Sequence, residues 1–93
     1  MAERTVAVAS RVGLHARPAM IFTQAVAAAG IPVTIAAEGG LAVDASSILL
    51  VMSLGVPCGA KVTLAADGPR SDEVLDGLVE LLSRDLDAPE ATS

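Results

Sequence analysis

The sequence is poor in several residue types, and each scarcity argues against a class of protein. It contains no tryptophan, no tyrosine and a single phenylalanine, and its six basic residues face eleven acidic ones. Nucleic-acid-binding proteins generally carry basic stripes and aromatic stacking platforms, so we expect no nucleic-acid partner. Cys58 is the lone cysteine, which excludes an intrachain disulfide. We therefore expect a reducing compartment and a cytoplasmic location.

Long hydrophobic runs are also absent. The longest strongly apolar run, Ile48–Met52, is far shorter than the ~20 residues needed to cross a bilayer, so we expect no membrane insertion. The chain of 93 residues suffices for one domain with one small core. We expect a single domain over residues 1–93, ordered from about residue 3 to 86, with a flexible tail at 87–93.

The spacing of apolar residues predicts four strands and three helices. Alternating patterns predict strands at residues 5–9, 33–37, 41–44 and 61–66, with a glycine turn joining the second strand to the third. Helical spacing predicts helices at residues 16–29, at about 47–54 and from Ser71 onward. The order of these elements predicts an α+β fold of two layers, in which the helices cover one face of a sheet.

The only histidine, His15, precedes the first predicted helix, in the run Gly13–Ala19. Pro18 suits the first turn of a helix, where backbone N–H groups have no partner within the helix. Those N–H groups, here at Ala16 and Arg17, favour an anion and disfavour a charged imidazole. The Arg17 guanidinium matches the oxygens of a phosphoryl group. These features predict a phosphate site, the alternative being an ordinary solvated histidine.

The short second helix has more apolar residues than one buried face can hold. Five consecutive apolar residues, Ile48–Met52, occupy about 1.4 turns, so some of them must point outward. On the first helix, Met20 and Gln24 lie off the buried stripe. We expect exposed apolar side chains on both helices, although a core position is the alternative for some of them.

Two motifs resemble those of the histidine-containing phosphocarrier (HPr) family of the bacterial phosphoenolpyruvate-dependent sugar phosphotransferase system. The first is Gly13–Ala19, and the second is Ser47–Gly55, which reads Ser-Ile-Leu-Leu-Val-Met-Ser-Leu-Gly. The resemblance spans roughly residues 3–83. It implies an open-faced sandwich with a four-stranded antiparallel sheet in the order 1-4-2-3 and three helices on one face.

The resemblance also implies a phosphoryl carrier rather than an enzyme. His15 would accept a phosphoryl group on Nδ1 from phosphorylated enzyme I and pass it to the A domain of a sugar-specific enzyme II. Arg17 would neutralise the group during transfer, and the helix N-terminus at Ala16 and Arg17 would hold it in the phosphorylated protein. The short helix lies beside the histidine in this family, so the partners would dock on Met20, Gln24, Ile48, Leu49 and Met52.

Ser47 aligns with a serine that many family members from Gram-positive bacteria phosphorylate in regulation. Phosphorylation here would bring in a serine kinase and transcriptional regulators as partners, and the added charge would repel partners from the neighbouring apolar patch. The alternative is a helix N-cap that needs no kinase. The sequence departs from the family at Ser46, where a basic or polar residue such as lysine is usual, and at Leu50, which replaces a common glycine.

The sequence has neither a cluster with metal-ligand spacing nor a Walker-type glycine-rich loop, so we expect no metal and no cofactor. Transfer through an exposed histidine suits a monomer that alternates between partners. The alternative function is a non-catalytic regulatory binding module of the same fold, acting through Ser47 and the apolar patch. Such a module can dispense with the histidine, so the presence of His15 in an intact motif favours the carrier.

Overall fold

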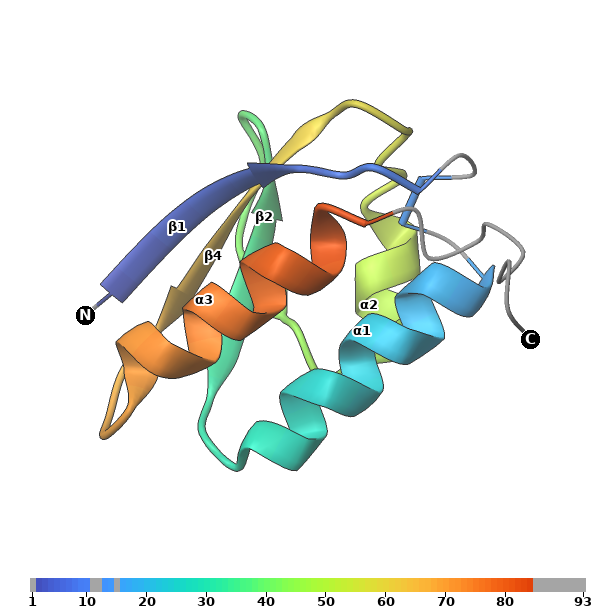
Figure 1. The fold of residues 1–93 in the computed structure, drawn as a ribbon. Helices are drawn as coiled ribbons and strands as arrows, with labels where there is room; N and C mark the ends of the chain where they lie inside the picture. Colours follow the sequence, from blue (N-terminus) through green and yellow to red (C-terminus); the bar gives the residue numbers. More distant parts are fainter. Residues whose placement is uncertain (1, 11–12, 15, 85–93) are drawn as a thin grey trace.

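Strands and helices alternate along the chain in the way the sequence predicts. The computed structural model describes residues 2–10, 13–14 and 16–84. In these ranges the strands are β1 (Ala2–Ala7), β2 (Val33–Ala37), β3 (Val43–Asp44) and β4 (Lys61–Ala66), and the helices are α1 (Ala16–Ala29), α2 (Ile48–Ser53) and α3 (Ser71–Leu82) (Figure 1). The expected tail at residues 87–93 lies outside the described ranges.

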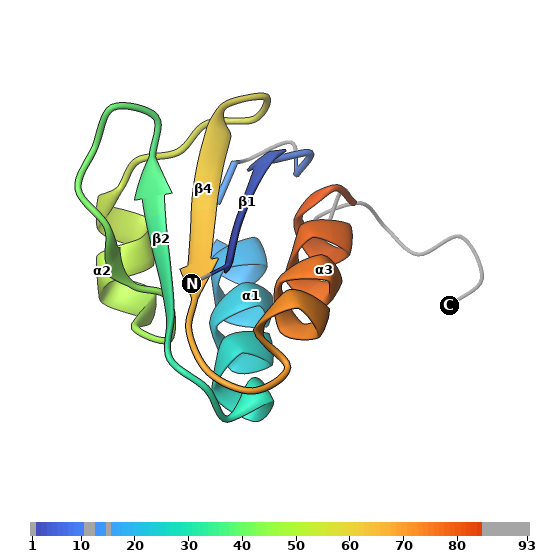
Figure 2. The same ribbon diagram turned by 90° about the vertical axis from the view of Figure 1, so that its left-hand side faces the viewer.

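The sheet is antiparallel throughout and has the strand order β1-β4-β2-β3. The three helices cover one of its faces (Figure 2), which confirms the predicted open-faced sandwich. Helix α1 packs against α2 on one side and against α3 on the other. None of the helices in the described ranges is long and apolar enough to cross a membrane.

The core lies between the sheet and the helices and is built almost entirely from aliphatic side chains. Phe22 on α1 is fully buried and is the largest side chain in the core. It belongs to the apolar stripe predicted for α1, in which Pro18 and Val26 are also buried. Ala25 and Ala29 continue that stripe but are only half-buried, because they face a groove between α1 and α3.

Strand β1 begins and ends earlier than predicted. The prediction of a strand at residues 5–9 is wrong at both ends, because β1 already pairs with β4 at Ala2 and leaves the sheet after Ala7. Arg4 occupies a half-buried position of this strand and hides the alternation in the sequence. Its guanidinium reaches Asp76 at 3.0 Å and Asp72 at 3.1 Å on α3. A long charged side chain can cover apolar surface in this way while its end stays in water.

Strand β3 is shorter than predicted. The expected strand at residues 41–44 shrinks to Val43–Asp44, which pairs only with Ile35 and Thr34. The Ala37 carbonyl, which would face Leu41 in a longer ladder, instead accepts a hydrogen bond of 2.8 Å from Gly40 N–H. A tight turn therefore ends the hairpin early, and Leu41 stands exposed in the loop.

Helix α3 begins at Ser71, as predicted, but without a side-chain cap. The N-cap position is Arg70, which has a left-handed backbone conformation with φ +64° and forms no capping hydrogen bond through its side chain. A left-handed conformation is costly for a residue other than glycine. Arg70 is thus an exposed arginine held at the start of α3 by an unusual backbone.

Candidate functional site

The two sequence motifs, nearly thirty residues apart, meet in the fold because α1 packs against α2. Figure 1 shows the start of α1 and helix α2 at the same end of the molecule. His15 itself lies outside the described residues. Its neighbours are described: Leu14 is buried, and Ala16 is the first residue of α1. The chain is therefore fixed on both sides of the histidine.

Backbone hydrogen bonds connect the segment before His15, of which residues 8–10 and 13–14 are described, to distant parts of the chain. Val8 N–H donates to the Ala60 carbonyl at 2.9 Å, and Gly59 N–H donates to the Val8 carbonyl at 2.7 Å. Leu14 N–H donates to the Val56 carbonyl, also at 2.9 Å. We call residues 54–60, which connect α2 to β4, the support loop. This loop holds both ends of the segment that leads to the histidine.

Helix α3 provides a second anchor for the same segment. Ala9 N–H donates to the carbonyl of Leu82, the last residue of α3, at 3.0 Å. The Ser10 hydroxyl donates to the Arg84 carbonyl at 3.5 Å. The segment is thus attached to the loop on one side and to the end of α3 on the other.

Gly13 packs directly against the support loop. Its φ is +74°, a conformation that favours glycine. A Cβ atom added at this position would lie 2.2 Å from the Val56 carbonyl oxygen and 2.8 Å from Pro57 Cα. Any side chain would therefore push the loop away. The glycine of the first motif is required by both its conformation and its packing.

The start of α1 carries a positive charge that no carboxylate of the described residues pairs with. Arg17 is exposed, and within the described ranges no carboxylate forms an ion pair with it, whereas Arg4 and Arg84 are both paired. The first turn of α1 contains no acidic residue. Free N–H groups at a helix start favour an anion. Pro18 is buried while Arg17 is exposed, so this end of the helix presents a guanidinium to solvent.

The predicted docking residues are exposed with one exception. Met20, Ile48 and Leu49 are 45%, 37% and 78% exposed, and Gln24 is exposed as well. The expected exposure of Met52 is wrong. Met52 is half-buried and packs against the core, which its long flexible side chain can reach from a position beside the buried Val51.

Sequence reasoning missed Leu50, which is 42% exposed. Helical geometry explains the pattern, since each residue turns by about 100° and Val51 faces the core. Leu49 then lies nearly opposite Val51 and is the most exposed apolar residue of α2, whereas Leu50 lies at the side. If Val51 had been assumed to face the core, the turn of about 100° per residue would have predicted that Leu50 is exposed. We call Met20, Ile48, Leu49 and Leu50 the apolar patch.

Ser47 is the N-cap of α2. Its hydroxyl accepts a hydrogen bond from Leu50 N–H at 3.4 Å. The preceding residue, Ser46, donates its hydroxyl and its N–H to Asp44 Oδ1 at 2.7 and 2.9 Å. These two bonds, the hydroxyl bond above all, lower the pKa of Asp44. A carboxylate that stays charged therefore lies close to the start of α2.

No group of three or more histidine, cysteine or acidic side chains within residues 2–10, 13–14 and 16–84 is arranged to hold a metal ion. Cys58, in the support loop, is exposed, and its thiol donates to the Ala9 carbonyl at 3.7 Å.

Comparisons with known proteins agree with the geometry. The family model described as the PTS HPr component phosphorylation site matches residues 2–84. The phosphocarrier protein HPr of Streptomyces coelicolor is 45% identical over 94% of this chain and 94% of its own length.

Solved structures give the same result. A crystal structure of HPr from Thermoanaerobacter tengcongensis aligns with a TM-score of 0.87 and 33% identity over 97% of this chain and all of that one. A crystal structure described as an HPr dimer from the same organism has a TM-score of 0.71 and 34% identity over 95% of this chain and all of that one. The chain therefore belongs to the HPr family, the phosphoryl carriers of the phosphotransferase system.

Proposed function

We propose that His15 is the residue of this carrier that bears the phosphoryl group. The observation that carries the proposal is the position of the only histidine, inside the first motif and directly before α1, between buried Leu14 and the first helical residue, Ala16. Transfer of a phosphoryl group depends mainly on position and charge stabilisation. The hydrogen bonds of the residues before His15 would supply the position. The start of α1 with Arg17 would supply the charge stabilisation.

The proposed reaction has two steps. In the first, the bond between phosphorus and the donor group of phosphorylated enzyme I breaks while a bond to His15 Nδ1 forms. In the second, that bond breaks and the group moves to the A domain of an enzyme II. Arg17 stabilises the negative charge in both steps, and the free N–H groups at the start of α1 hold the group between them. We place this exchange in the cytoplasm.

Both partners would use the same surface in turn. The apolar patch supplies contact area, and Gln24, exposed on α1, adds a polar contact. Exposed apolar side chains gathered in this way are typical of protein-binding surfaces. The start of α1 and helix α2 lie at the same end of the molecule, so the proposed acceptor and docking surface would be adjacent.

The deciding experiment incubates the protein with phosphoenolpyruvate and enzyme I and locates the acid-labile phosphate by mass spectrometry. We expect one phosphoryl group on His15 and none on the His15→Ala variant. Equal labelling of that variant would sink the proposal.

Arg17 is tested in the same assay by rate. The loss of a charge-assisted hydrogen bond costs about 1.5–3 kcal/mol, so Arg17→Ala should slow transfer roughly 10- to 100-fold. Arg70→Gln is the matched control, because it removes an exposed arginine at the start of α3, across the groove from Ala29 at the far end of α1. It should transfer at the rate of the unmodified protein. An equal slowing of both variants would assign the effect to net charge rather than to a clamp.

A regulatory role for Ser47 is a finer proposal. Its position beside Ile48 and Leu49 supports it, because a phosphate there would place charge next to the apolar patch. Asp44, hydrogen-bonded to Ser46, opposes it by repelling a second negative group. A serine kinase assay decides the matter. Incorporation that is lost in Ser47→Ala and kept in Ser46→Ala supports regulation, and no incorporation into the unmodified protein removes it.

A further inference from the structure

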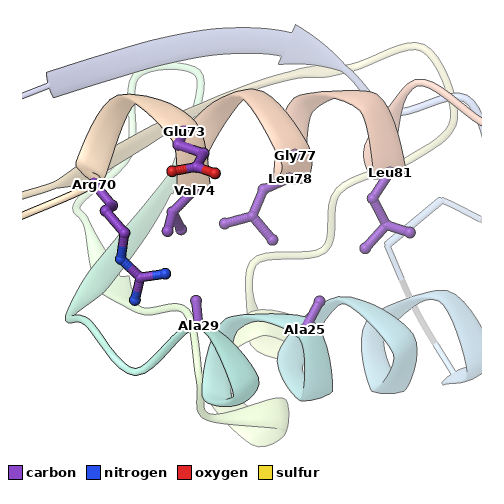
Figure 3. A pocket seen from close by; sticks show the side chains of 8 residues that line it. All are labelled: Ala25, Ala29, Arg70, Glu73, Val74, Gly77, Leu78 and Leu81. Carbon is purple, nitrogen blue, oxygen red and sulfur yellow. The ribbon is translucent and has the colours of Figure 1, made fainter.

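A groove between α1 and α3 lies at the opposite end of α1 from the proposed acceptor. The groove is open to solvent and has a volume of about 350 Å³, within the range of about 300–1,000 Å³ that small-molecule sites occupy. Figure 3 shows α3 along one side and α1 along the other. The lining residues are Ala25, Ala29, Arg70, Glu73, Val74, Gly77, Leu78 and Leu81.

The groove is open because small residues stand where larger ones would fit. Gly77 lies in the middle of α3, where glycine costs about 1 kcal/mol relative to alanine. Packing does not require it, since a Cβ at this position would meet nothing within 4 Å, and its φ is not positive. Ala25 and Ala29 form the facing wall. Gly77 therefore makes α3 less stable and leaves the apolar space beside it unfilled.

Two opposite charges mark one end of this apolar space. Arg70 and Glu73 both line it, and they form no ion pair with each other in the described part of the chain. In Figure 3 the Arg70 side chain extends from the start of α3 toward Ala29, while the Glu73 carboxylate stays at the level of α3. A ligand that satisfies both must carry an anion and a cation a short distance apart. The apolar wall beyond them requires a hydrophobic group.

We propose that this groove binds a small zwitterion with a large apolar group, the chemistry of an apolar α-amino acid. The ligand's carboxylate pairs with the Arg70 guanidinium and its ammonium faces Glu73. Its hydrophobic side chain lies along Val74, Leu78 and Leu81. The site is separate from the phosphoryl-accepting end, so its existence does not depend on the role of His15.

The test is a titration of the full chain followed by amide NMR signals, with L-leucine as the probe. We expect saturable shifts confined to the groove. Three probes each remove one feature: 4-methylpentanoate lacks the ammonium, 3-methylbutan-1-amine lacks the carboxylate, and glycine lacks the apolar group. Each should bind at least fivefold more weakly than L-leucine. Equal binding of 4-methylpentanoate, shifts outside the groove, or no saturable shift would overturn the proposal.

Variants locate the site on the protein. Arg70→Gln and Glu73→Gln should each weaken L-leucine binding at least fivefold, and Gly77→Leu should abolish it by filling the groove, with the rest of the NMR spectrum unchanged. Arg84→Gln is the matched control, since it removes an arginine beyond the other end of α3 and should bind as the unmodified protein does. Binding that survives Gly77→Leu, or falls equally in Arg84→Gln, would show that the groove is not the site. The rate of phosphoryl transfer by the same variants is measured separately, because the groove and the phosphoryl-accepting end are different sites.

Discussion

At the scale of single residues, Gly13 carries the strictest requirement in the described chain. It combines a positive φ with direct contact against Val56 and Pro57, whereas Gly30 has nearly the same φ and nothing within 4 Å of an added Cβ. The pair separates two effects that usually occur together, backbone strain and steric overlap. At Gly30 a side chain would cause backbone strain but no steric overlap.

Gly13→Ala should therefore destabilise the protein by at least about 2 kcal/mol, from strain and overlap together. Gly30→Ala, the control, should cost only about 1 kcal/mol. Urea unfolding followed by circular dichroism measures both. Because the support loop would shift, Gly13→Ala should also slow phosphoryl transfer, and Gly30→Ala should not. Equal stabilities of the two variants would contradict the close contact.

Asp44 provides a residue-scale prediction in pH. Its pKa is lowered by the Ser46 hydroxyl and the Ser46 N–H, so the charged form is favoured in the folded state. The resulting stabilisation is present above the unfolded pKa and is lost as the pH falls through the lower folded value. Ser46→Ala should raise the pKa of Asp44 part of the way back, measured by carboxyl carbon NMR. Ser53→Ala, whose hydroxyl donates to the Leu50 carbonyl, should leave it unchanged. An unmoved titration in Ser46→Ala would contradict the hydroxyl bond.

At the scale of elements, α3 is both an anchor and a weak point. Its C-terminal carbonyl at Leu82 accepts from Ala9, and its exposed face binds Arg4 of β1 through Asp72 and Asp76. Yet Gly77 lies at mid-length in this helix without a packing reason. The helix holds β1 and the residues before His15 although glycine makes its own backbone less stable than alanine would.

Gly77→Ala should accordingly stabilise the protein by about 0.5–1 kcal/mol, because alanine loses less backbone entropy in a helix. Thermal unfolding should show a higher midpoint. The methyl group is too small to fill the groove, so L-leucine binding should persist. A lower unfolding temperature would contradict the open space around Gly77.

At the scale of the whole molecule, the element order, the helical stripes and the two-layer architecture could be predicted from periodicity. The strand order 1-4-2-3 could not, and it entered only through the resemblance to HPr proteins. Predictions from local sequence patterns failed where a contact between residues far apart in the sequence determines the structure. Arg4 hid the start of β1 because its partners, Asp72 and Asp76, are about seventy residues away. Most of the bonds that hold residues 8–10 and 13–14 connect backbone groups, which leave no trace in side-chain patterns.

The oligomeric state is a prediction for the whole molecule. We expect a monomer of 9.3 kDa, because one exposed end must meet two partners in turn and the apolar patch is small. Light scattering during size-exclusion chromatography, over a range of protein concentrations, measures the mass. A stable dimer, the form described for two of the solved structures that resemble this chain, would contradict the expectation. Loss of that dimer in Leu49→Ser would then place the contact on the apolar patch.

The attachment of Val8, Ala9 and Leu14 to the support loop and to α3 also matters for the order of synthesis. Because synthesis runs from the N-terminus, a ribosome makes these residues before their anchors at Val56, Ala60 and Leu82. The nascent chain therefore contains His15 before the contacts that hold the neighbouring residues can form. Under the proposed function, positioning of the histidine would be complete only after α3 is made, and a chain truncated before Leu82 would lack the anchor of Ala9.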